Sequence, residues 1–64
     1  MFEKLIGALG KKVVITFVDS DVQRGTLLRN MNGYTVVEDE FDLLLPTGLH
    51  YVFHYSSALS VNVY

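Results

Sequence analysis

Two histidines and a run of acidic residues are the side chains in this sequence that could hold a metal ion or transfer protons. His50 and His54 stand in a segment that alternates like a β-strand, which would place them about 13 Å apart, too far to share one ion. The same alternation sends Glu38 and Glu40 to one face of a strand and Asp39 to the other. We therefore expect structural or surface histidines and a charged strand end, with a metal shared between subunits as the alternative.

Catalysis needs a set of residues that this chain does not offer. No nucleophile, base and orienting group occur together, and no glycine-rich phosphate loop is present. A chain of 64 residues buries only about 60% of its unfolded surface, so an active-site cleft would consume scarce core. We predict a protein that is not an enzyme and that carries no cofactor and no metal.

The aromatic and basic residues raise the possibility of nucleic-acid binding. Tyr51, Phe53 and Tyr55 share one strand face, where we expect core or subunit interface, with Tyr55 nearest to a ligand. Lys11 and Lys12 could contact phosphate, although an ordinary solvated surface explains them equally well. The net charge of −2 means that RNA binding would require the five cations to lie on one face. These cations are Lys4, Lys11, Lys12, Arg24 and Arg29.

The elements that must position these residues begin with a short amphipathic helix. Its apolar stripe consists of Phe2, Leu5, Ile6 and Leu9, while Ala8 falls off the stripe. Gly10 follows and can take the left-handed conformation that ends a helix.

Alternating segments then predict five strands. They cover residues 13–18, 22–29, 34–40, 50–55 and 58–63. Turn signals separate them at residues 19–21, at the Asn32–Gly33 pair and at residues 46–48. Gly25 inside the second strand indicates a bend or a close approach of another backbone. The pattern predicts one mostly β domain over residues 1–64, a short helix followed by a strongly bent, antiparallel, SH3-like barrel of five strands.

The chain shows no apolar run long enough to cross a membrane and no export signal, so we expect a cytoplasmic protein that does not bind membranes. It has no cysteine, so disulfides and thiolate metal sites cannot stabilise it. Oligomerisation, very good packing or another kind of metal site would have to do so.

Two segments resemble the Sm-like family, which includes the Sm and LSm proteins and bacterial Hfq. The first runs from Leu9 to Phe17 and continues through Asp19-Ser20 to Gly25-Thr26-Leu27, and it is similar to the first family motif. The second, from Tyr55 to Val61, is similar to the Hfq-type segment near the C-terminus. The resemblance implies a homo-oligomeric ring, with roughly five to seven subunits, in which the fourth strand of one copy pairs with the fifth strand of the next.

The chain departs from the family pattern at the turns that bind RNA in the family. Ser20 stands where the motif has glycine, and Ser56 and Ser57 stand where the Hfq-like pattern has lysine and histidine. The chain also has no Arg-Gly-Asn at its last turn, as eukaryotic Sm proteins do. The position of the base-contacting residue stays open between rival candidates in the turn after the second strand. The complete candidate set for RNA is Asn32, Tyr34, Thr35, Tyr55, Ser56, Ser57, Lys11 and Lys12.

We therefore predict a subunit of an Sm-like ring that binds single-stranded RNA. The alternative is a non-enzymatic, protein-binding or structural oligomeric module, such as a small phage-type protein, without an RNA role. The net negative charge of the chain would suit that alternative.

Overall fold

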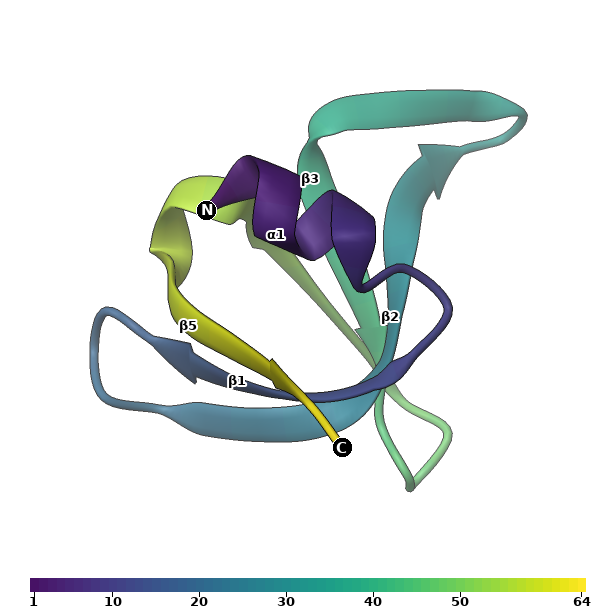
Figure 1. Ribbon diagram of the computed structural model, residues 1–64. Helices are drawn as coiled ribbons and strands as arrows, with labels where there is room; N and C mark the ends of the chain where they lie inside the picture. Colours follow the sequence, from purple (N-terminus) through teal and green to yellow (C-terminus); the bar gives the residue numbers. More distant parts are fainter.

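The computed structural model describes residues 1–64 as one helix and a five-stranded antiparallel sheet (Figure 1). The elements are α1 (Phe2–Gly7), β1 (Lys12–Phe17), β2 (Val22–Asn32), β3 (Thr35–Leu44), β4 (His50–His54), the 3₁₀ turn η1 (Tyr55–Ser57) and β5 (Ala58–Val63). The predicted helix and five strands are thus all present. No helix has the length and apolar character needed to cross a membrane.

Helix α1 covers one end of the curled sheet (Figure 1). Leu5 is fully buried, as its place on the apolar stripe predicts. The assignment of Ala8 was wrong, because Ala8 is buried while Ile6 is exposed. The helix ends at Gly7, so the residues after it no longer follow the helical spacing on which the stripe was based. Gly10 has the expected positive φ of 78°, and its N–H donates to Leu27 of β2.

Strand β1 lies inside the sheet and supplies the centre of the core. Val13, Ile15 and Phe17 are buried, which confirms the predicted alternation. Strand β1 pairs with β2 on one side and with β5 on the other, so its backbone has partners along both edges. The remaining buried apolar residues come from the helix, from Ala8 directly after it, and from β2, β3, β4 and the start of β5.

The sheet has the strand order β4-β3-β2-β1-β5 and curls so that non-neighbouring strands touch inside it. Phe17 of β1 lies with its ring centroid 5.1 Å from that of Phe53 and 5.1 Å from that of Tyr51, both on β4. Strands β4 and β5 remain the two edges and do not pair with each other. The protein is therefore a small, β-rich fold with an open, curled sheet.

Gly25 permits the closest approach between two strands. A Cβ atom at this position would overlap the backbone carbonyl oxygen of Leu44 and lie 2.8 Å from the carbonyl carbon. Strand β2 therefore needs glycine where it bends along β3, which confirms the role inferred from the sequence.

The hairpin between β2 and β3 is longer than predicted. Strand β2 continues to Asn32, which pairs with Thr35, and the turn itself consists of Gly33 and Tyr34. Gly33 has a φ of 63°, as the first central residue of a type II′ turn requires. Pairing of β2 with β1 and of β3 with β4 stops before the tip, so the outer hairpin is a two-stranded ribbon that projects from the body (Figure 1).

Candidate assembly edges and nucleic-acid interface

Two unpaired strand edges are the first candidate functional feature. Strand β4 pairs only with β3, and β5 pairs only with β1. Apolar side chains lie exposed along both edges: Val52 on β4 is 51% exposed, and Leu59 and Val63 on β5 are 63% and 55% exposed. Neither strand contains Lys, Arg, Asp, Glu or Pro, the residues that commonly block edge-to-edge pairing. Both edges can therefore accept another strand.

A groove of about 340 Å³ separates strand β4 from the end of β1. Phe17, Tyr51 and Phe53 line it together with the exposed Val18 and with Ser57. The N–H of Val18 donates to the carbonyl of Ser57 over 2.9 Å, which extends the pairing of β1 towards η1. The groove thus lies beside the η1 turn that leads from β4 to β5.

The first group of predicted RNA-binding residues lies at the tip of the β2–β3 hairpin. Asn32, Tyr34 and Thr35 are all exposed, and the Tyr34 side chain is fully open to solvent. Met31 and Val36 add exposed apolar surface to the same ribbon. The tip can therefore offer an aromatic ring and polar groups to a ligand without any change in the fold.

The second group forms the 3₁₀ turn between β4 and β5. Tyr55 is partly buried, with its ring centroid 5.5 Å from that of Phe2 and 4.6 Å from that of His54. The N–H of Ser56 donates to Nδ1 of His54 over 3.1 Å, and the Ser56 hydroxyl lies 2.7 Å from the same nitrogen. Because a backbone N–H can only donate, Nδ1 accepts, and His54 caps the turn. Ser57 faces the groove described above.

The structure keeps these two groups apart within one chain. Figure 1 shows the hairpin tip projecting on one side of α1 and the η1 turn beside the N-terminus of α1 on the other. Lys11 follows the helix and Lys12 begins β1, away from both groups. A continuous surface that includes all eight candidate residues is therefore not present in the single chain.

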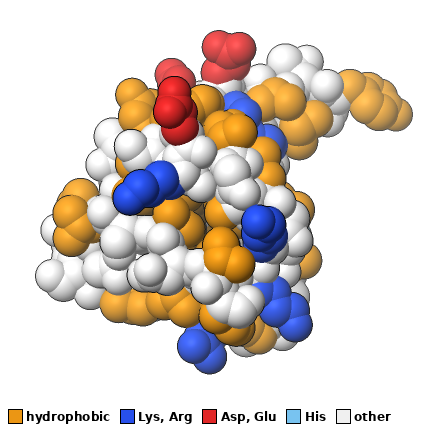
Figure 2. All heavy atoms as spheres, in the orientation of Figure 1, with side chains coloured by type: hydrophobic (Ala, Val, Ile, Leu, Met, Phe, Trp, Pro, Cys, Tyr) orange, Lys and Arg blue, Asp and Glu red, His pale blue; other side chains and the backbone are white.

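Several cations lie on the face of the molecule that carries α1. Figure 2 shows Lys and Arg side chains spread across the face that carries α1, with Asp and Glu side chains only near its upper margin. Arg29 has other contacts, because its guanidinium lies 4.9 Å from the Phe41 ring centroid and donates to the Glu38 carbonyl over 2.7 Å. Arg24 similarly lies 5.0 Å from the ring centroid of Tyr64.

The histidines have separate structural contacts. Nδ1 of His50 lies 2.6 Å from Oδ2 of Asp42, within hydrogen-bond distance, while His54 caps η1. The second carboxylate oxygen of Asp42 is buried without a hydrogen-bond partner. No three His, Asp or Glu side chains come together in a way that could hold a metal ion.

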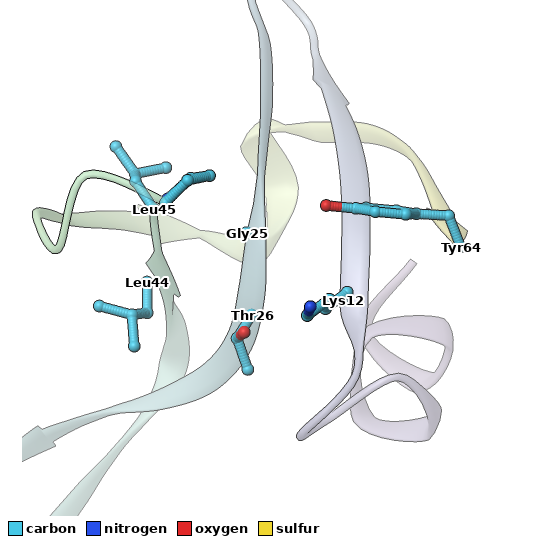
Figure 3. A pocket seen from close by; sticks show the side chains of 7 residues that line it. Lys12, Gly25, Thr26, Leu44, Leu45 and Tyr64 are labelled. Atoms are coloured by element: carbon cyan, nitrogen blue, oxygen red, sulfur yellow. The ribbon is translucent and has the colours of Figure 1, made fainter.

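Sequence reasoning missed a hollow on the outer face of the sheet. It lies above Gly25 and Thr26 of β2, between Leu44 of β3 and the side chains of Lys12 and Tyr64 (Figure 3). Gly25 indicated close packing at this point. Nothing local in the sequence indicates that the side chain of Tyr64 reaches the hollow. The pairing of β5 with β1 brings Tyr64 there, and its N–H donates to the Lys12 carbonyl over 3.0 Å.

Comparison of the chain with protein-family models, with curated proteins and with solved structures finds no match. The Sm-like resemblance therefore rests on the motifs in the sequence.

Proposed function

We propose that the protein is an Sm-like subunit of a homo-oligomeric ring that binds single-stranded RNA. The observation that carries this proposal is the strand order, which leaves β4 and β5 as unpaired edges with exposed apolar side chains. Pairing of β4 of one copy with β5 of the next would satisfy both edges at once. A head-to-tail contact of this kind closes into a ring when its rotation divides a full turn.

RNA binding is supported by the basic face and by the exposed tyrosine. Lys11 and Lys12 are exposed and have no acidic partner within the chain, so they are free to contact phosphates. Tyr34 offers a ring on which an unpaired base could stack, beside the polar groups of Asn32 and Thr35. In a ring, hairpin tips and η1 turns of neighbouring copies would alternate around one axis.

Filter binding with short U-rich and A-rich RNA oligonucleotides over a range of salt concentrations tests the RNA proposal. We expect affinity to fall steeply with salt, because neutralised phosphates release counterions. Replacement Tyr34→Ser should weaken binding by about 1–3 kcal/mol, the contribution of one stacked base. Leu49→Ser is the control, since Leu49 is also exposed but lies in the β3–β4 loop. Absence of binding at low salt would contradict the RNA proposal and favour the alternative, a protein-binding or structural oligomer.

A further inference from the structure

The hollow above Gly25 gathers three polar groups that have no partner within the protein. The Lys12 amine, the Thr26 hydroxyl and the Tyr64 hydroxyl make no hydrogen bond or ion pair to any other side chain or backbone group. Figure 3 shows the amine of Lys12 and the hydroxyl of Tyr64 both directed towards β2, where Thr26 lies. Each of the three can donate a hydrogen bond to a group bound in the hollow.

The sheet fixes the positions of these groups. Thr26 pairs with Lys12 on one side and with Leu44 on the other, so the three residues form one row across the outer face. Tyr64 extends this row through its backbone bond to Lys12, and its ring stacks against the Arg24 guanidinium. The short Thr26 side chain between longer neighbours creates the hollow.

The opposite wall is apolar. Leu44, Leu45 and Pro46 form it, and no Asp or Glu side chain lines the hollow. Its volume is about 210 Å³, which is below the range of about 300–1,000 Å³ for sites that enclose drug-sized ligands. The hollow is therefore suited to a small group with one polar end and one apolar end.

We propose that this hollow binds a small organic carboxylate with a flat apolar body. The carboxylate would accept hydrogen bonds from Lys12, Thr26 and Tyr64, and the apolar body would lie against Leu44 and Leu45. A single ammonium and two neutral hydroxyls line the hollow, which matches a ligand with one negative charge, and Arg24 is not among the lining residues. The site lies within one chain and depends on neither the ring nor RNA.

Titration of the ¹⁵N-labelled full chain with phenylacetate, followed by amide chemical shifts, tests this assignment. We expect saturable shifts at Lys12, Gly25, Thr26 and Tyr64 with a Kd on the order of 1 mM, as suits a small ligand on an open site. The neutral analogue phenylacetamide should bind about tenfold more weakly, because it cannot use the charge of Lys12.

Two variants localise the binding. Lys12→Met should weaken phenylacetate binding about tenfold, whereas Lys4→Met, which removes a charge on α1 that does not line the hollow, should leave it unchanged. Both positions are exposed, and the same spectra report whether each variant is folded. Equal effects of the two variants would overturn the proposal, as would an absence of saturable shifts in the hollow.

Inorganic phosphate and acetate separate the proposed site from an ordinary counterion position. If either ion binds as tightly as phenylacetate at the same amides, the apolar wall contributes nothing and the proposal fails. If the protein binds phenylacetate in the hollow but binds no RNA, only the RNA proposal is refuted.

Discussion

Ser20 holds a backbone conformation that glycine adopts more easily. Its φ of 73° is the only positive value outside glycine in the chain, and it lies in the turn between β1 and β2. A Cβ atom makes this region unfavourable by about 1 kcal/mol or more. The turn is nevertheless well connected, since the Asp21 N–H donates to Oδ1 of Asp19 over 3.0 Å. Ser20 thus adopts a backbone conformation that glycine favours, although it carries a Cβ atom.

Replacement Ser20→Gly should stabilise the protein by up to about 1 kcal/mol, with the extra entropy of glycine in the unfolded chain offsetting part of the gain. Urea unfolding of the purified variant measures the change. Ser20→Ala is the control, because it removes the hydroxyl but keeps the Cβ atom and should bring no gain. Equal stabilisation by alanine would show that the strain is not the cause.

Gly25 should tolerate no side chain. We expect Gly25→Ala to destabilise the fold by about 3 kcal/mol, because the new methyl group would overlap the Leu44 backbone, which cannot move independently of β3. Gly7→Ala is the matched control at a glycine with open space around it. In the last turn of α1 this alanine should stabilise by about 0.5–1 kcal/mol. Thermal unfolding followed by circular dichroism would measure both, and similar effects would contradict the packing argument.

At the scale of elements, the η1 turn depends on the cap that His54 provides. His54→Ala leaves the Ser56 N–H without its acceptor and should destabilise the protein by about 1 kcal/mol, the usual contribution of an N-cap. His54→Asn keeps a short side-chain acceptor and should recover most of this loss. Comparison of the two variants by urea unfolding distinguishes the cap from the contact between His54 and Tyr55, which both variants lose.

The sequence predicts elements well where the signal is local. The alternation of apolar residues correctly predicted the buried face of β1. Gly25 indicated the bend in β2, and Gly33 indicated the turn between β2 and β3. Ala8 was placed wrongly because tertiary packing, and not helical spacing, decides burial after the helix ends. The Lys12–Tyr64 hollow could not be predicted, since it depends on the register between β1 and β5, which no short segment encodes.

At the scale of the whole molecule, a small core is combined with two open edges. A chain of 64 residues is marginally stable by burial alone, and pairing of the edges between copies would add to its stability by mass action. We therefore expect the melting temperature to rise with protein concentration.

Val52→Lys should remove this dependence, because a charged side chain on the β4 edge opposes strand addition. Native mass spectrometry should then find a monomer in place of a ring. Leu49→Lys places the same charge in the β3–β4 loop and should leave the assembly intact. A wild-type monomer at micromolar concentration would contradict the ring directly.

The projecting β2–β3 ribbon has a consequence for how the molecule opens. Its outer residues bury little apolar surface and lack a third strand, and a lone two-stranded hairpin is at most marginally stable in water. The ribbon should therefore fray many times for each global unfolding event. In hydrogen exchange, amides near Gly33 should lose protection long before those of β1, while the body of the protein stays folded. A ligand held at the tip would then appear as slower exchange at these amides.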